Sequence, residues 1–176
     1  MIRSVKKEDA ERLIEIYAPC IINSPISFET EVPSLDEFQK RIEEVTSKFP
    51  WLVLEENGVV LGYAYASTHR IRSAYAWSVE CTVYVDQKFH GKGIGTKLYK
   101  ELFRLLKDQG VANVLAGITI PNIGSVKIHE SLGFEQVATY KDIGFKNGQW
   151  WDVGWWQLQL QKVKTPSAIL PPKKIP

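Results

Sequence analysis

The pattern of hydrophobic and polar positions predicts a succession of strands and helices along the chain. Residues 2–5 form a short apolar run typical of a strand, and apolar positions then recur at helical spacing from Asp9 onward. Ser34 and Glu37 have the spacing of a capping box, in which each side chain bonds the other residue's free backbone N–H. The apolar stripe behind them predicts a second helix that ends before Pro50.

The middle of the chain predicts a hairpin followed by a longer strand. Two extended runs, 51–55 and 59–67, flank Asn57-Gly58, the dipeptide most typical of a two-residue hairpin turn. A strand is then expected from Tyr75 to Val85, because apolar and polar side chains alternate there. Its polar face includes Glu80.

The second half of the chain continues with strand, helix, strand and helix before a final hairpin. A glycine-rich turn at 91–96 precedes an amphipathic helix that ends near Gly110. Residues 114–120 predict a strand, and a short helix should end just before Gly133, a residue typical of helix C-termini. A hairpin is expected over 135–161. This order predicts a mixed sheet with helices on its faces.

The length and composition indicate one globular domain and a short tail. The chain has 176 residues, of which 44% are hydrophobic and 24% charged. Residues 1–163 form the expected domain. Residues 164–176 contain four prolines and three lysines without apolar periodicity, so we expect a flexible tail that takes no part in the core.

Charge, hydropathy and cysteine spacing each argue against one kind of partner. The four lysines from Lys162 onward account for more than the net charge of +2, so the rest of the chain is slightly acidic. A slightly acidic body argues against nucleic acid as a partner. The N-terminus is charged and no later segment is apolar enough to span a bilayer, so we expect a cytoplasmic protein without a membrane partner. The two cysteines lack metal-ligand spacing, and we expect no metal.

The segment between the strand ending at Val85 and the following helix carries the clearest chemical signal. Gly91, Gly93 and Gly95 can bring successive backbone N–H groups close to an anion, and the helix N-terminus adds unpaired amides. A merely tight strand-to-helix turn is the alternative. The pattern is neither a P-loop nor a complete G-x-G-x-x-G fingerprint.

This segment resembles a motif of the GNAT acetyltransferase superfamily. His90–Thr96 is similar to the Q/R-x-x-G-x-G/A motif that wraps the pyrophosphate of CoA, with His90 in the place of the usual glutamine or arginine. Asn122–Phe134 resembles the N-x-x-S/A-x-x-x-Y/H-E-x-x-G-F motif of the same superfamily. The resemblance implies a mixed, mostly antiparallel twisted sheet flanked by about four helices.

A narrower resemblance extends over nearly the whole folded chain. It concerns the phosphinothricin acetyltransferase group, which includes enzymes acting on methionine sulfoximine and methionine sulfone, and it is carried by Ser27–Glu31, Pro50–Val53, Ala74–Val85 and Trp151–Gln157. It implies transfer of an acetyl group from acetyl-CoA to the amino group of a small acidic amino acid. It also implies a homodimer with substrate sites near the subunit interface.

The resemblance assigns residues to the co-substrate. The backbone of Val83, Tyr84 and Val85 would bond the pantetheine arm. The pyrophosphate would be held by the loop residues Gly91, Lys92, Gly93, Ile94, Gly95 and Thr96. Asn122 resembles a CoA-contacting asparagine, although a turn residue after Pro121 is an equally good interpretation.

Two residues are candidates for proton transfer. Glu80 is an acid in an otherwise β-branched and aromatic strand, and a general base is needed because an ammonium group is not nucleophilic. A salt bridge on an exposed sheet face is its alternative role. His129 stands where many GNAT enzymes have the tyrosine that protonates the departing thiolate, or it caps or packs a short helix. Tyr99 is expected in the core.

Four residues resemble positions that line the amino-acid pocket of the group: Phe28, Arg72, Tyr75 and Trp77. Arg72 could hold a carboxylate or phosphinate through two contacts, or it could be a solvated loop residue. Two other functions remain open: acetylation of a protein N-terminus or lysine, and a sensor that binds acetyl-CoA without turnover.

Overall fold

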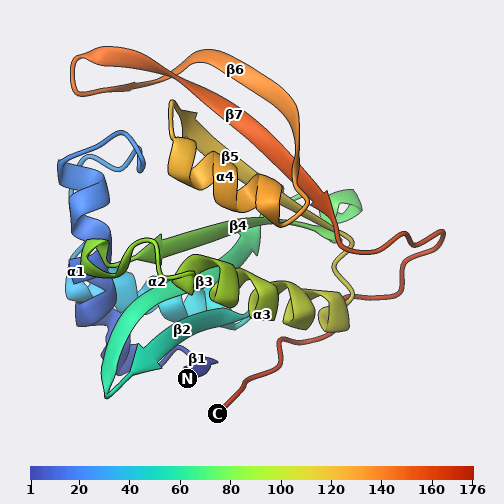
Figure 1. Ribbon diagram of the computed structural model, residues 1–176. Coiled ribbons are helices and arrows are strands. Elements are labelled where there is room, and N and C mark those ends of the chain that lie inside the picture. Colours follow the sequence, from blue (N-terminus) through green and yellow to red (C-terminus); the bar gives the residue numbers. More distant parts are fainter.

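The computed structural model describes residues 1–176 and contains a seven-stranded sheet (Figure 1). The strand order is β1-β2-β3-β4-β5-β7-β6, and every neighbouring pair is antiparallel except β4 and β5. The strands are β1 (Ile2–Ser4), β2 (Trp51–Glu56), β3 (Val59–Thr68), β4 (Ser78–Val85), β5 (Asn113–Ile120), β6 (Glu135–Lys146) and β7 (Gln149–Gln159).

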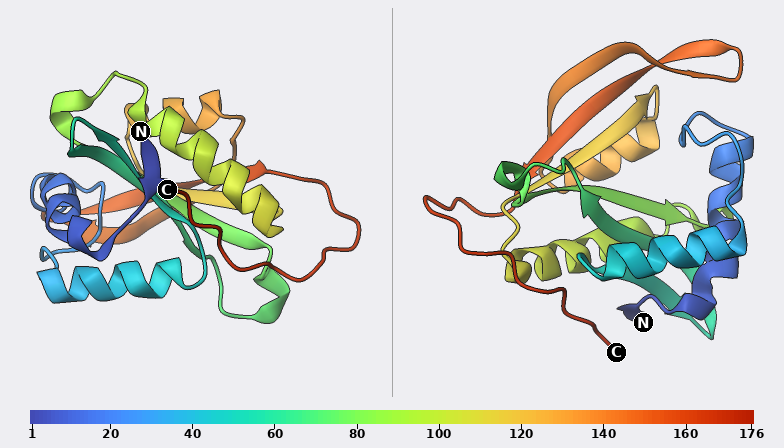
Figure 2. Two further views of the ribbon diagram at one scale, coloured as in Figure 1. Left: turned by 90° about the horizontal axis from the view of Figure 1, so that it is seen from below. Right: turned by 180° about the vertical axis from the view of Figure 1, so that it is seen from behind.

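Four helices cover the two faces of this sheet. α1 (Ala10–Ile22) and α2 (Leu35–Thr46) pack on one face, and α3 (Ile94–Gln109) and α4 (Ile123–Ser131) on the other (Figures 1 and 2). Each face has its own core, since α3 packs leucines against the sheet, whereas α1 and α2 cover a cluster rich in aromatic rings. The predicted mixed, mostly antiparallel sheet with about four helices is confirmed.

The helix cap, the hairpin turn and the helix end indicated by the sequence form as expected. The Ser34 hydroxyl accepts a hydrogen bond from the backbone N–H of Glu37 at 3.3 Å, and the Glu37 carboxylate accepts one from the N–H of Ser34 at 2.8 Å. Asn57 and Gly58 both have positive φ, as the tight turn between β2 and β3 requires. α3 ends at Gly110, whose φ of 102° lies in the left-handed region.

The strand expected from Tyr75 to Val85 begins later than predicted. Residues Ser73–Tyr75 form a 3₁₀ turn, and β4 starts at Ser78. The reason is the absence of pairing partners: β3 ends at Thr68, which pairs with Val79, and β5 pairs with nothing before Ser78. A strand needs a neighbour for its backbone groups.

The C-terminal segment follows the body of the domain instead of leaving it. Ile169 and Ile175 pack against the core that contains α3. The backbone N–H of Leu170 donates to the carbonyl of Gln109 at 2.9 Å, and Ile175 exchanges two hydrogen bonds with Ser4 at the free edge of β1. The two termini therefore lie close together (Figure 2). These contacts contradict the expectation that residues 164–176 take no part in the core.

None of the helices combines the length and the apolar character needed to cross a bilayer.

Truncation after Val163 should therefore destabilise the domain. Loss of two partly buried isoleucines and their backbone hydrogen bonds should cost about 1–2 kcal/mol. In a chain of this size each kcal/mol shifts the melting temperature by about 2–4 °C. A thermal melt measures this effect. Ile169→Ser should lower the melting temperature, whereas Leu170→Ser, which changes an exposed neighbour, should not. An unchanged melting temperature of the truncated chain would show that the segment does not dock.

Candidate active site

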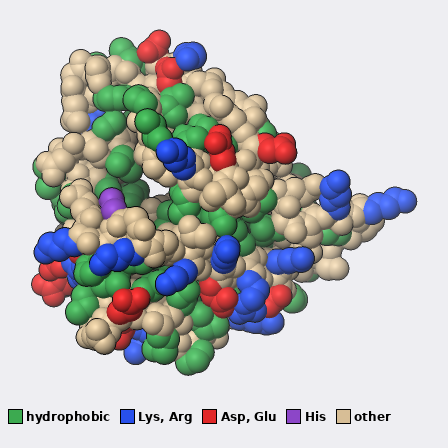
Figure 3. Space-filling view, viewed as in Figure 1, with side chains coloured by type: hydrophobic (Ala, Val, Ile, Leu, Met, Phe, Trp, Pro, Cys, Tyr) green, Lys and Arg blue, Asp and Glu red, His purple; other side chains and the backbone are tan.

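A wedge-shaped opening separates β4 from β5. The two parallel strands pair only from Ser78 to Glu80 on β4, opposite residues 113–115 on β5. Beyond that point β4 stays paired with β3 and β5 stays paired with β7, so the two strands diverge (Figure 1). A cavity of about 100 Å³ lies in the wedge, lined by both strands and α4. The molecule is visibly hollowed on this side (Figure 3).

The diverging half of β4 contains the residues expected to meet the pantetheine arm. Val83, Tyr84 and Val85 lie beyond the last β4–β5 pair, so their backbone has no strand partner on the wedge side. The valine side chains pack toward the core under α3, and Tyr84 packs into the aromatic core on the other face. One carbonyl is already used, because His90 Nε2 lies 2.9 Å from the carbonyl oxygen of Val85 and donates to it.

The glycine-rich loop directs a series of free amides outward at the start of α3. Gly91 and Gly93 have φ values of 77° and 72°, which other residues rarely adopt. None of the backbone N–H groups from Gly91 to Thr96 donates a hydrogen bond within the chain. Free amides at a helix N-terminus are a ready site for phosphate. The loop therefore fits the diphosphate of CoA.

The side chains of this loop have other partners. The ammonium group of Lys92 lies 4.9 Å from the centre of the Phe89 ring, and the Ile94 side chain is buried in the core. Gly95 packs closely under α4, since a Cβ there would lie 2.8 Å from the end of the Ile128 side chain. The backbone of the loop and the exposed ammonium group of Lys92 are thus available to an anion.

Asn122 caps α4. Its side-chain oxygen accepts a hydrogen bond from the N–H of Ser125 at 3.1 Å, which is the standard role of asparagine at a helix N-terminus. The residue also lines the wedge cavity. Asn122 is therefore a helix cap, whereas the alternative expected from the sequence was a turn residue after Pro121.

His129 is buried beside the wedge and is held as a neutral ring. Its Nδ1 lies 2.7 Å from the carbonyl oxygen of Ser125 and must donate to it, because a carbonyl only accepts. Nε2 then accepts from the hydroxyl of Tyr99, 3.2 Å away. Burial lowers the pKa of His129. Tyr99, expected only in the core, also lines the wedge.

Glu80 lies at the apex of the wedge, on the face covered by α1 and α2. It is the last β4 residue paired with β5, and its side chain is about 30% exposed. Its carboxylate accepts a hydrogen bond from His69 Nδ1 at 2.8 Å, and Arg70 lies 3.9 Å away. No spacing rule in the sequence indicated His69. The two meet because Ser67 of β3 pairs with Glu80 of β4.

The expected substrate residues are not gathered in one pocket. Phe28 packs against the bend of β6 at Gly144. Arg72 and Tyr75 line a cavity shared with the C-terminal segment, although the Tyr75 ring also lies 5.9 Å from the ring of His69. Trp77 contacts the C-terminal segment instead, since its indole N–H donates to the carbonyl of Ser167 at 2.7 Å.

The loop that carries Phe28 is fixed at both sides. Lys146, from the β6–β7 hairpin, donates hydrogen bonds of 2.6–2.8 Å to the carbonyls of Ile21, Ser27 and Glu29. Burial lowers the pKa of this lysine. Glu29 is also paired with Arg41 of α2. The loop is therefore positioned by contacts from two separate elements, β6 and α2.

A further cavity opens beneath α2 on the same face as Glu80. It has a volume of about 220 Å³ and is lined by aromatic rings, including Trp51 and Tyr65, with Arg41 at its side. Ser67, the β3 partner of Glu80, also lines it. The cavity thus extends from the aromatic core to the β3 residue that pairs with Glu80.

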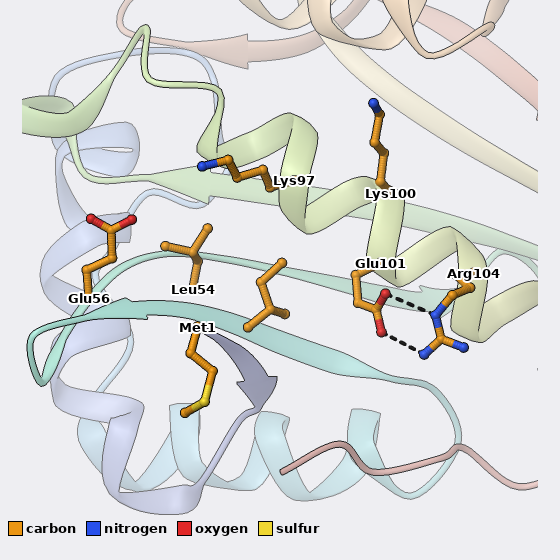
Figure 4. A pocket seen from close by; sticks show the side chains of 8 residues that line it. Met1, Leu54, Glu56, Lys97, Lys100, Glu101 and Arg104 are labelled. Atoms are coloured by element: carbon orange, nitrogen blue, oxygen red, sulfur yellow. Dashed lines mark hydrogen bonds and ion pairs between the residues drawn. The ribbon is translucent and has the colours of Figure 1, made fainter.

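A larger cavity than the wedge lies elsewhere. It has a volume of about 590 Å³ and lies between the β1–β2 edge and α3, with Lys97 and Lys100 extending from the helix (Figure 4). Arg104 is paired with Glu101 there. This cavity shares no lining residue with the wedge.

Comparison with known proteins identifies the family of the chain. The chain matches the acetyltransferase (GNAT) domain family over residues 2–155. The phosphinothricin N-acetyltransferase of Streptomyces viridochromogenes is 37% identical over 174 residues, which cover 99% of this chain and 95% of that protein. The L-methionine sulfoximine/L-methionine sulfone acetyltransferase of Salmonella typhimurium is 34% identical over 168 residues, covering 95% and 98%.

A solved structure extends the comparison to the fold. The phosphinothricin acetyltransferase of Sinorhizobium meliloti, in complex with acetyl-CoA, superposes with a TM-score of 0.92 at 34% identity, covering 97% of this chain and 95% of that one. The chain therefore belongs to the GNAT acetyltransferase family, and the resemblance seen in the sequence is confirmed. It is an acetyltransferase that uses acetyl-CoA as the acetyl donor.

Replacement of Gly93 by alanine should weaken acetyl-CoA binding more than tenfold. The positive φ of this residue directs the loop amides, and each lost hydrogen bond to a charged group costs about 1.5–3 kcal/mol. Gly58→Ala is a matched control, because that glycine has a similar φ of 78° and equally open surroundings but lies in the β2–β3 turn. Calorimetric titration should find normal affinity in Gly58→Ala. Equal affinity in both variants would refute the loop assignment.

Proposed function

We propose that the protein transfers the acetyl group of acetyl-CoA to the α-amino group of a small acidic amino-acid analogue of the phosphinothricin, methionine sulfoximine or methionine sulfone type. The wedge between β4 and β5 carries this proposal, because free amides line the approach from one face and Glu80 stands at its apex on the other. Both substrates would be bound together, and the amine would attack directly. The named activities of the similar proteins support the acceptor class.

The chain's own groups would bind the co-substrate in two places. The amides from Gly91 to Thr96 would hold its diphosphate, and the free backbone of Val83, Tyr84 and Val85 would bond the amides of its pantetheine arm. Acetyl-CoA supplies a thioester carbonyl at the apex of the wedge. The hydroxyl of Tyr99, held by neutral His129, would lie on the side of the departing sulfur.

On the opposite face, the acceptor would lie between the Glu80 carboxylate and the loop fixed by Lys146. Phe28, Arg72 and Tyr75 are proposed to bound this region, with Arg72 pairing with the acidic group of the acceptor. The aromatic cavity beside Ser67 offers room for the rest of the side chain. We do not propose that Trp77 binds the acceptor, because its indole N–H already donates to the carbonyl of Ser167.

We propose a homodimer formed through the β6–β7 hairpin. Ile143, Phe145 and Trp150 are each more than half exposed, and the two aromatic rings pack edge to face across the strands. An exposed apolar patch of this kind is typical of an interface. We also place the reaction in the cytoplasm, where acetyl-CoA is made.

The acceptor is tested by kinetics across a panel of amines. The protein should acetylate phosphinothricin, methionine sulfoximine and methionine sulfone in preference to peptides that offer a free N-terminus or a lysine. Arg72→Ala should raise the KM for the amino acid more than tenfold, since a charge-assisted pair is worth about 1.5–3 kcal/mol, and leave the KM for acetyl-CoA nearly unchanged.

Arg70→Ala removes the neighbouring loop arginine and serves as the control. Preference for peptides would favour a protein acetyltransferase, and binding of acetyl-CoA without turnover of any amine would favour a sensor. Equal effects of Arg72→Ala on both substrates would show that the residue maintains the fold.

The dimer is tested by introducing charge into the patch. Phe145→Asp should convert the protein to a monomer in light scattering, because a buried carboxylate in an apolar interface is costly. Val59→Asp, at an equally apolar exposed position on β3, should leave the mass unchanged. A monomeric wild-type protein would refute this proposal.

A further inference from the structure

We propose that His69 is the base that accepts the proton of the acceptor's ammonium group, and that Glu80 is the positioning residue that orients its ring. The proposal rests on the proposed function, because it concerns the acceptor of the same reaction. It replaces the simpler interpretation in which Glu80 meets the ammonium group itself.

The hydrogen bond between the two side chains fixes the tautomer of the histidine. Nδ1 of His69 lies 2.8 Å from Oε1 of Glu80. An ionised carboxylate only accepts hydrogen bonds, so Nδ1 must carry the hydrogen. In the neutral ring the lone pair then lies on Nε2, and no hydrogen bond within the chain involves that atom. Nε2 is thus free to accept a proton.

The ring is placed between the carboxylate and the wall of the wedge. His69 packs edge to face against Trp155, with ring centres 6.1 Å apart. The Trp155 ring in turn lies 3.2 Å from the position that a Cβ on Gly117 would occupy, and Gly117 lines the wedge cavity. The side chain of His69 is 13% exposed and that of Glu80 is 30% exposed. The histidine therefore lies one aromatic ring away from Gly117, a residue that lines the wedge.

The chemistry favours the imidazole over the carboxylate as the proton acceptor. A general base works best when its pKa lies near the pH of the reaction. The ordinary pKa of an imidazole is about 6.5, whereas that of a glutamate carboxyl is about 4.3. A base held by a third group is the usual arrangement of an activated site.

The groups that face the pair from neighbouring elements do not ordinarily change charge near neutral pH. Arg70 and Tyr65 lie near the carboxylate, whereas Tyr75 and Trp155 face the imidazole ring of His69. Arginine, tyrosine and tryptophan do not change charge between pH 5 and 8.

The proton balance of the transfer is complete with this assignment. The ammonium group gives one proton to Nε2 of His69, and the nitrogen lone pair forms the new bond to the acetyl carbon. The carbon–sulfur bond breaks with its electrons on sulfur. The nitrogen loses a second proton as the amide forms. One of the two protons ends on the sulfur, and the other passes from His69 to water.

The decisive experiment compares pH profiles of His69→Asn and Glu80→Gln. Asparagine can keep the amide donor toward Glu80 but has no basic nitrogen. We expect kcat for the amino acid to fall about 10²–10⁴-fold in His69→Asn and the acidic limb of the profile to disappear. In Glu80→Gln the rate should fall, but an acidic limb should remain because the histidine still titrates. Arg104→Gln, which changes an exposed arginine on α3 away from the pair, should keep both the rate and the limb.

NMR gives a readout that does not depend on turnover. In the wild-type protein without substrates, ¹⁵N shifts should show His69 with its hydrogen on Nδ1, and the pH at which this ring titrates should match the acidic limb. Glu80→Gln should lose the preference for that tautomer. This measurement also decides the proposal if His69→Asn does not fold.

The opposite pattern would overturn the proposal. If His69→Asn keeps its acidic limb and nearly normal kcat while Glu80→Gln loses both, then Glu80 is the base. A hydrogen on Nε2 of His69 would overturn it as well. A wild-type protein that acetylates no amino acid would instead refute the proposed function, and the tautomer measurement would remain interpretable.

Discussion

The early end of the pairing between β4 and β5 determines most of the other features of the site. Each strand keeps its other neighbour, β3 or β7, so divergence leaves backbone groups of β4 unpaired without unfolding the sheet. Unpaired backbone groups in an interior are costly unless something satisfies them. An amide-bearing arm can do so, which is why we propose that the co-substrate binds at this break in the sheet. The paired end of the wedge fixes Glu80 at the apex.

The divergence also separates two chemical environments. On the α3 and α4 side, His129 is buried and neutral, and its Nδ1 donates to a backbone carbonyl. The hydroxyl of Tyr99 therefore donates to Nε2. On the α1 and α2 side, His69 is paired with a carboxylate near an opening. Two histidines with fixed tautomers therefore lie on opposite faces of one sheet. Their partners, rather than their residue type, decide which can take a proton from the amine.

Local physics made much of the fold predictable. The capping box at Ser34, the turn at Asn57-Gly58 and the glycine loop depend on neighbours only a few residues away, so their residues carried the information directly. The site depended on longer distances. His69 meets Glu80 through the β3–β4 register, and Trp77 bonds a residue 90 positions away, so no spacing rule could indicate either contact. The C-terminal segment was misjudged for the same reason, because its isoleucines find partners in distant elements.

A crystal structure with acetyl-CoA tests the central claim most directly, because it shows where the arm of the co-substrate lies. The account predicts the diphosphate within hydrogen-bond distance of the amides from Gly91 to Thr96. It also predicts the pantetheine amides paired with the backbone of Val83 to Val85, and the thioester at the apex beside Glu80 and His69. Acetyl-CoA bound along the cavity at Lys97 and Lys100, with β4 and β5 free of it, would contradict the account.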